Sequence, residues 1–108
     1  MMEIETNVSH YLGEELAVNR LHQMVDSLED RFRDQVHHVK SHWNGNELDI
    51  SFDAYGFQIQ WHATVLSDRI ALMGRIPASA KMFRGKIEQA IVSRVEAILQ
   101  GPISAPAN

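Results

Sequence analysis

The middle of the chain alternates between apolar and polar residues with a period of two. Three segments show this pattern, residues 47–53, 57–65 and 70–76, and in each the apolar residues fall on one side, as Ile59 and Trp61 do. Strict alternation of this kind is typical of antiparallel strands that bury one face and leave the other polar. With a further strand before them, these segments predict a four-stranded meander.

Three two-residue turns connect the predicted strands. Asn-Gly at residues 44–45 is a strong hairpin signal, because both turn positions must tolerate a positive φ. Tyr-Gly at residues 55–56 and Ser-Asp at residues 67–68 fit the same spacing. Counting outward from all three turns keeps the apolar residues on one face, which a slip of one residue would not do.

The turns also predict which residues face one another across the strands. They place Trp61 opposite Gly74, where the indole can cover a residue without a side chain. On the polar face they predict one cross-strand row, consisting of Lys40, Asp49, His62 and Met73. A carboxylate beside an imidazole is the start of a general-base pair, but no Ser, Thr or Cys nucleophile falls in this row. A solvated face with paired charges is therefore the favoured interpretation.

Two amphipathic helices flank the strands. The first opens at Gly13 and carries an apolar stripe, at spacings of three to five residues, as far as Phe32. The second begins near Ser79, has Phe83 as the first residue of its apolar stripe, and ends at Gly101-Pro102. Each stripe is suited to packing on the apolar face of the sheet.

The whole pattern predicts one α+β domain over residues 1–101, with both helices on one face of a four-stranded antiparallel meander. A short alternation over residues 2–8 allows a fifth strand at the N-terminus. Residues 102–108 are predicted to form a flexible tail. A chain of 108 residues fits one domain, and its 44% of hydrophobic residues is ordinary for a globular protein.

Composition excludes several classes of function. The net charge of −4 argues against general nucleic-acid binding, which requires a basic face. The absence of cysteine removes thiol chemistry and thiolate metal sites. No segment approaches the roughly 18 apolar residues of a transmembrane helix, and the N-terminus has no secretory pattern. The sequence therefore predicts a cytoplasmic protein without a transmembrane segment.

The six histidines suggest a metal site, but their spacing does not support one. His38 and His42 share one face of a strand, where four residues at ~3.3 Å each separate them by about 13 Å, too far for one ion. The remaining histidines lie elsewhere, and no HExxH motif occurs. The sequence therefore predicts neither a metal nor another cofactor.

Two features point to contact with a partner. Four cations gather around the start of the second helix: Arg75, Lys81, Arg84 and Lys86. Cations at this position oppose the helix dipole and would suit an anionic partner, but pairing with acids such as Glu3, Glu5 or Asp34 is the favoured interpretation. Trp43 lies at the end of a hairpin, where it is expected to be partly exposed. The predicted partner-binding residues are Trp43, His62, Met73, Arg75, Lys81 and Arg84.

Three stretches of the sequence resemble one known family. They are His10-Tyr11-Leu12-Gly13 at the start of the first helix, the hairpin Trp43-Asn44-Gly45-Asn46-Glu47-Leu48, and the late helix from Phe83 to Leu99. In these stretches the chain is similar to the polyhydroxyalkanoic acid system protein family, over about residues 4–99. The motifs consist of turn glycines and core positions and contain no catalytic signature. The resemblance implies a context of polymer storage and names no molecular activity.

These observations favour a non-enzymatic binding or adaptor protein associated with polyhydroxyalkanoate storage, which acts at the granule or on a granule protein. The alternative is a small helix-over-sheet module that binds an apolar or acyl ligand between its layers; an enzyme is the third possibility. An empty apolar cavity of a few hundred Å³ would favour the ligand, and a filled core with an exposed apolar patch would favour the adaptor.

The uncovered polar face of the sheet also predicts a homodimer, because a two-fold axis brings each patch onto its own copy. If the histidines of this face lie at the contact, their protonation near pH 6 is expected to weaken the dimer.

Overall fold

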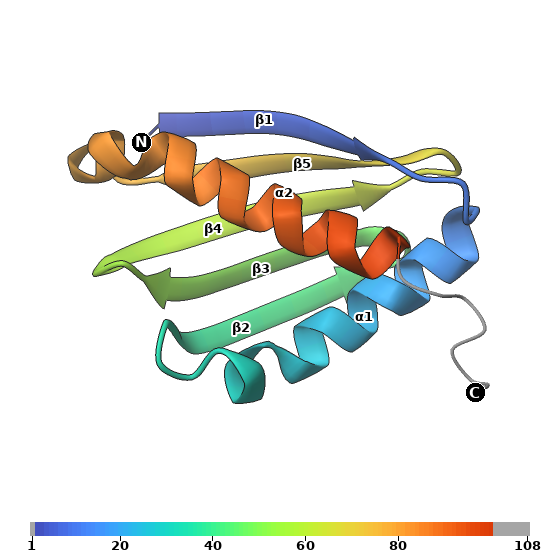
Figure 1. Ribbon diagram of the computed structural model, residues 1–108, viewed down its shortest axis with the longest axis horizontal. Helices are drawn as coiled ribbons and strands as arrows, with labels where there is room; N and C mark the ends of the chain where they lie inside the picture. Colours follow the sequence, from blue (N-terminus) through green and yellow to red (C-terminus); the bar gives the residue numbers. More distant parts are fainter. Residues whose placement is uncertain (1, 101–108) are drawn as a thin grey trace.

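The computed structural model describes residues 2–100, and the predicted tail at 102–108 lies outside them. A five-stranded antiparallel sheet forms one layer, and two helices lie on one of its faces (Figure 1). The strands are β1 (Met2–Ser9), β2 (Val36–Asn44), β3 (Glu47–Ala54), β4 (Phe57–Val65) and β5 (Arg69–Ile76). The helices are α1 (Glu14–Arg31), the short 3₁₀ helix η1 (Ala78–Phe83) and α2 (Arg84–Gln100). The predicted α+β class is confirmed.

The sheet has five strands because the N-terminal segment is a full member of it. The strand order is β1-β5-β4-β3-β2, so β1 extends the meander at its β5 edge. Pairing between β1 and β5 runs from Met2 opposite Ile76 to Ser9 opposite Arg69. Ile4 of β1 is fully buried and helps to close the core. The prediction of four strands and an optional fifth is therefore close to the observed sheet.

Two of the three predicted hairpins have the predicted register. Tyr55 and Gly56 form the β3–β4 turn with φ values of 58° and 81°, and a type I′ turn requires a positive φ at both positions. Asp49 faces His62, and His62 faces Met73, as counted from the β3–β4 and β4–β5 turns. The polar row is therefore confirmed across β3, β4 and β5.

The β2–β3 hairpin differs from the prediction by one turn position. Its loop is residues 45–46 and not 44–45. His42 therefore lies opposite Asp49 and completes the polar row, so the prediction that Lys40 belongs to this row was wrong. The side-chain amide of Asn46 donates to the carbonyl oxygen of Val65 at 2.7 Å, and the Asn46 carbonyl accepts from the Val65 N–H at 2.9 Å. These two bonds keep Asn46 in the loop. Because the register moves by two residues, the same side chains still face the polar side.

A bulge interrupts β2. Two of its residues, His38 and Val39, lie between the cross-strand pairs on either side and face only Phe52 of β3. His38 has a positive φ of 57°, and its Nδ1 lies 2.9 Å from the carboxylate of Asp53. The extra residue reverses the alternation of side chains between the two faces of the sheet. As a result, His37, which precedes the bulge, lies opposite Asp53 on the polar face. Simple alternation did not predict this position for His37.

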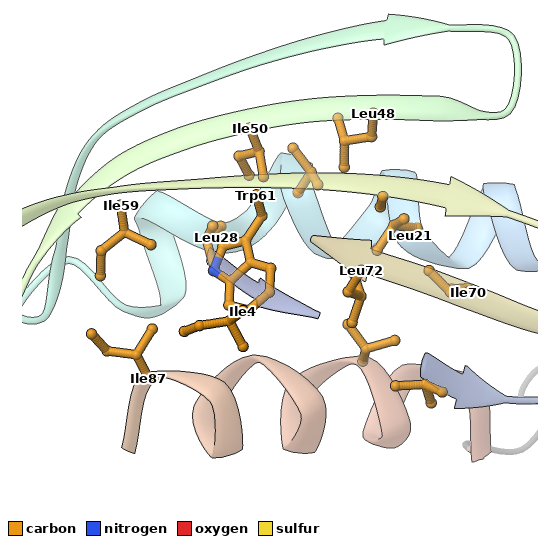
Figure 2. Packing of buried hydrophobic residues seen from close by; sticks show 14 of the residues in the cluster. Ile4, Leu21, Leu28, Leu48, Ile50, Ile59, Trp61, Ile70, Leu72 and Ile87 are labelled. Carbon is orange, nitrogen blue, oxygen red and sulfur yellow. The ribbon is translucent and has the colours of Figure 1, made fainter. Parts of the chain in front are cut away.

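The core lies between the apolar face of the sheet and the two helices (Figure 2). Trp61 is 2% exposed and belongs to the same buried cluster as Leu28 of α1 and Ile87 of α2, which confirms its predicted place beneath the helices. A Cβ atom built on Gly74 would lie 2.7 Å from the indole ring of Trp61. The side chain that is missing at Gly74 therefore makes room for the indole, as the predicted register required.

The second helix begins later than predicted. Residues 78–83 form η1, and α2 starts at Arg84. Ser79, the predicted N-cap, lies inside η1, which has no side-chain cap. A 3₁₀ helix has about three residues per turn, whereas an α-helix has about 3.6. The apolar residues of this segment therefore do not continue the stripe of the α-helix that follows. Phe83, predicted to be the first buried residue of the stripe, is instead 39% exposed.

Candidate functional site

One end of the sheet is held by His10. Its side chain is buried, and its Nδ1 accepts a hydrogen bond from the N–H of Leu12 at 3.1 Å. The opposite ring nitrogen, Nε2, lies 3.0 Å from the carbonyl oxygen of Leu66 and must carry the proton that it donates there. The N–H of His10 also donates to the carbonyl of Asp68 at 2.9 Å. His10 thus connects the β1–α1 loop to the β4–β5 turn.

Asn46 lies in the β2–β3 turn and makes two hydrogen bonds to Val65, the residue at which β4 enters the β4–β5 turn. We call this region, residues 65–68 together with His10 and Asn46, the motif end. Both of the sequence motifs at its edge, around His10 and around Asn46, meet here. The side chains of His10 and Asn46 bond to backbone partners, so these two residues stabilise the fold.

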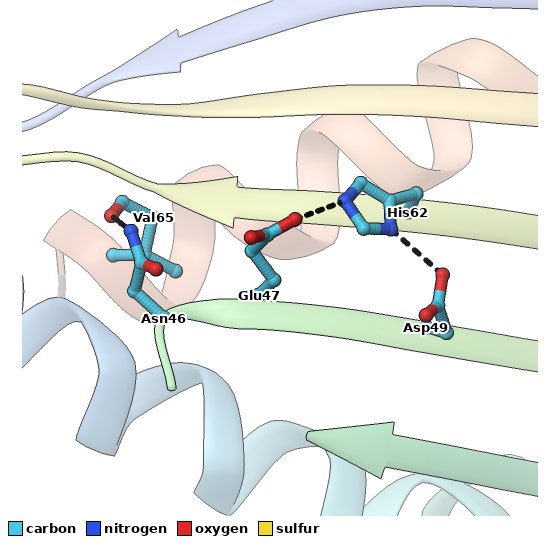
Figure 3. A network of polar contacts seen from close by, with 5 residues as sticks. All are labelled: Asn46, Glu47, Asp49, His62 and Val65. Carbon is cyan, nitrogen blue, oxygen red and sulfur yellow. Dashed lines mark hydrogen bonds and ion pairs between the residues drawn. The ribbon is translucent and has the colours of Figure 1, made fainter. Parts of the chain in front are cut away.

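The polar face of the sheet carries a histidine between two carboxylates. Nδ1 of His62 lies 2.7 Å from Asp49, and its Nε2 lies 3.0 Å from Glu47 (Figure 3). The hydrogen bond to Asp49 is the largest cause that raises the pKa of His62 above 6.5; burial opposes it, and Glu47 adds to it. Among the described residues, no three His, Asp or Glu side chains are placed to hold a metal ion together. The cluster is therefore an exposed charge network.

A shallow groove of about 540 Å³ runs across this face. It brings together three of the predicted partner-binding residues, His62, Met73 and Arg75. Arg75 lies 3.7 Å from the carboxylate of Glu3 on β1, which is one of the pairings that the sequence analysis favoured for its cations. Ser41 and Ser51 also line the groove, but the ring nitrogens of His62 pair with Asp49 and Glu47. We interpret the open groove as a polar contact surface.

More acids lie on this face than the predicted row contained. Glu47 and Asp53 face the same side as Asp49, and β1 adds Glu5 opposite Met73. Homodimer formation through this face stays a prediction. Its pH dependence at His62 changes sign, however, because protonation of an imidazole between two carboxylates lowers the net negative charge of the cluster. Acidification would then reduce the repulsion between two copies at this point.

Trp43 does not join the other predicted contact residues. Its indole stacks on the imidazole of His22 from α1, with ring centroids 3.9 Å apart and planes 14° apart. Trp43 is partly buried and packs against the core cluster. The side chain therefore joins β2 to α1, and its contact with a partner stays a prediction.

Lys81 and Arg84, the last two predicted contact residues, lie at the end of the sheet opposite the motif end. There η1 and the start of α2 meet the β3–β4 turn (Figure 1). Six consecutive residues are exposed, 81–86, and Met82 is 92% exposed. The ring of Phe83 lies 6.4 Å from that of Tyr55 and 5.6 Å from that of Phe57. We call this surface the tip; its residues are Tyr55, Phe57, Lys81, Met82, Phe83, Arg84 and Lys86.

The tip combines apolar and cationic side chains. The ammonium group of Lys86 lies over the ring of Tyr55, 5.4 Å from its centroid. Among the described residues, no carboxylate lies within 4 Å of the charged groups of Lys81, Arg84 or Lys86. The sequence analysis identified these cations but assigned Phe83 to the core and did not single out Met82. The run Lys-Met-Phe-Arg-Gly-Lys, with two large apolar residues between cations, was the available signal.

A small apolar cavity lies between the two helices and the sheet. Its volume is about 100 Å³, and its lining is mostly aliphatic and aromatic. This is well below the few hundred Å³ of a drug-sized ligand pocket. At one edge the guanidinium group of Arg94 on α2 stacks 3.6 Å above the ring of Phe32. The cavity is therefore smaller than the volume that the alternative, a module for an apolar or acyl ligand, was expected to have.

The fold defines a class: a small α+β domain with a five-stranded antiparallel sheet and two helices on one face. No described helix is long and apolar enough to cross a membrane. A family model described as "Putative polyhydroxyalkanoic acid system protein" matches residues 4–99, and the chain belongs to this family. Neither the curated proteins nor the solved structures give a match.

Proposed function

We propose that the protein is a non-enzymatic binding protein of the polyhydroxyalkanoate system that docks on the surface of the storage granule through the tip. The observation that supports this proposal is the almost fully exposed Met82 beside the aromatic cluster of Phe83 and Tyr55. A storage polyester presents an aliphatic surface to water. An apolar protein surface of this kind gains free energy when such a surface covers it.

The expected strength of docking is modest and reversible. Covering an exposed methionine side chain contributes about 1.5–3 kcal/mol to the free energy of docking. The rings of Phe83 and Tyr55 are only partly exposed, so covering each of them contributes a fraction of that amount. The three cations Lys81, Arg84 and Lys86 belong to the same surface, and no carboxylate of the described residues lies within 4 Å of their charged groups. Against a surface with anionic groups, each would contribute up to about 1 kcal/mol at low salt. The proposal places the protein in the cytoplasm, in contact with the granule.

A pelleting assay with poly(3-hydroxybutyrate) particles tests direct docking. Wild-type protein is expected to pellet with the particles, and Met82→Asp is expected to bind at least tenfold more weakly, because it replaces the apolar contact by a charge. Met73→Asp is the matched control: it changes an exposed methionine on the polar face, 38% exposed, and should pellet like the wild type. Thermal melts establish that both variants are folded.

Two outcomes would contradict the proposal. Equal losses in both methionine variants would remove the tip as the docking surface. Wild-type protein that pellets with native granules but not with bare particles would assign the contact to a granule protein.

The cations can be examined separately. Lys81→Glu, Arg84→Glu and Lys86→Glu together should weaken pelleting when the particles carry anionic surfactant, and the effect should fade as salt is raised. The control is Lys40→Glu, which reverses an exposed cation on the polar face. An unchanged affinity of the triple variant would leave docking to the apolar residues alone.

A further inference from the structure

The two helices beside the cavity are joined to each other outside its lining. The guanidinium group of Arg20 on α1 donates to the carbonyl oxygen of Ile98 on α2. Toward the other end of α1 the lining includes Met24, Leu28 and Phe32, and α2 contributes Ile91 among others. The lining thus comes from both helices and from the apolar face of the sheet, and we call this cavity the slot.

The charged side chain at this slot has no acidic partner. Arg94 is exposed and lines the cavity, and among the side chains that the structure describes no carboxylate lies within 4 Å of it. Its guanidinium plane rests on Phe32 at 3.6 Å. Stacking on a ring holds the plane in position and leaves the N–H groups at its edge free to donate, which is the arrangement that binds a carboxylate through two parallel hydrogen bonds.

The volume limits what the slot can hold. An apolar cavity of 150 Å³ takes up benzene, so the observed 100 Å³ corresponds to about four carbon atoms. A long acyl chain would have to displace core side chains, whereas a short one fits between Leu28 and Ile91 as they stand. Size and charge together therefore select a small molecule with a short aliphatic chain and one carboxylate.

We propose that this slot binds a short-chain alkanoate or hydroxyalkanoate, with the aliphatic chain between α1 and α2 and the carboxylate on the guanidinium group of Arg94. The slot and the tip share one residue, Tyr55, which lines the cavity, whereas Arg94 and Phe32 of the slot lie outside the tip and Met82 of the tip lies outside the slot. The acids from which polyhydroxyalkanoates are built belong to this chemical class. Free acid at the granule surface and an unrelated cellular carboxylate would offer the slot the same chemistry.

NMR titration of the whole chain with sodium hexanoate tests the site. Saturable shifts are expected at Leu28, Phe32 and Ile91, with a Kd on the order of 1 mM, the range for a ligand of this size. Butyrate should bind more weakly, by about fourfold for each methylene group that is lost from the slot. Octanoate should gain little over hexanoate, because the slot is already filled.

Variants separate the carboxylate contact from the apolar one. Arg94→Gln should weaken hexanoate at least fivefold and leave 1-hexanol unchanged, because the alcohol has no charge to pair. Arg84→Gln removes a cation of α2 outside the slot and should bind hexanoate like the wild type. Ala90→Leu, which extends a side chain into the slot, should abolish binding of both ligands while the protein stays folded.

Three results would overturn the proposal: equal hexanoate affinity in Arg94→Gln and wild type, shifts centred on Met82 and Phe83 at the tip, or no saturable shift up to about 10 mM hexanoate. Met82→Asp distinguishes this site from granule docking, since it should lose pelleting and keep hexanoate binding. Failure of either proposal is therefore visible without the other.

Discussion

The two ends of the sheet use their side chains in opposite ways. At the motif end, His10 and Asn46 give their polar groups to backbone atoms of the β4–β5 turn. At the tip, Met82 and Lys81 are exposed, and their neighbours Phe83 and Tyr55 contact each other at the surface. Two of the three stretches by which the sequence resembles its family thus hold the fold together at the motif end, whereas the third, Phe83 to Leu99, begins within the proposed docking surface. A recognisable motif need not mark the place where a protein acts.

The largest effect is expected between the two ends, at Trp61. Trp61→Ala removes a buried indole and should cost about 3–5 kcal/mol of the free energy of unfolding, which would affect the motif end and the tip together. Denaturant melts measure it. In the matched variant Gly74→Ala, a Cβ would lie 2.7 Å from the indole, and the overpacking should cost about 1–3 kcal/mol. A loss below 1 kcal/mol in Trp61→Ala would mean that the indole is not part of the core.

At the motif end, His10→Ala should cost about 2–3 kcal/mol, because it leaves the carbonyl of Leu66 and the N–H of Leu12 without partners. Pelleting with polymer particles should be unchanged at temperatures where the variant is folded. His42→Ala is the control, since it removes an exposed imidazole. If His10→Ala were fully stable but no longer pelleted, the assignment of the two ends would be reversed.

Asn46→Ala should have a smaller effect, about 1 kcal/mol, since one partly buried hydrogen bond to Val65 is lost. The neighbouring Asn44, which is exposed, offers the comparison: Asn44→Ala should change stability by less than about 0.5 kcal/mol. Chemical denaturation of both variants decides the point. Equal costs would show that the turn residue is not held through its side chain.

The smallest effect belongs to His62 on the polar face. Its pKa is raised in the folded protein, so its pairing stabilises the fold below about pH 6.5 and this contribution is lost as pH rises through the folded pKa. The side chain is 39% exposed, so the contribution should be a few tenths of a kcal/mol. Melts between about pH 5 and 8 should show this slope in the wild type and lack it in His62→Gln. An opposite slope would contradict the pairing.

Alternation predicted the sheet well because its apolar face is buried and penalises a slip in register. The β3–β4 and β4–β5 pairings, and the place of Trp61 over Gly74, followed from the residues alone. The β2–β3 turn was misplaced because a long-range bond decides it: Asn46 is held by Val65, and no local pattern reveals that partner. A two-residue shift preserves the faces, so the alternation could not detect the error.

The candidate surfaces were predicted less well. Lys81 and Arg84 were identified by charge, but the exposure of Phe83 depends on η1, where a 3₁₀ turn replaces the expected α-helical phase. Trp43 was assigned to a partner and stacks on His22 within the chain. Arg94 was not identified as a candidate from the sequence. Its guanidinium group is positioned by the ring of Phe32, which lies at the end of α1 and is far from Arg94 in the sequence.

The first strand of the chain pairs with the last, and this has a consequence for how the protein is made. Strands β2 to β5 are joined by short turns and can pair as soon as they leave the ribosome, whereas β1 must wait for β5. In that interval β1 has no partner and Ile4 remains uncovered, the condition in which a strand pairs with another copy of the chain. The first strand is therefore the one most open to aggregation during synthesis, before β5 covers it.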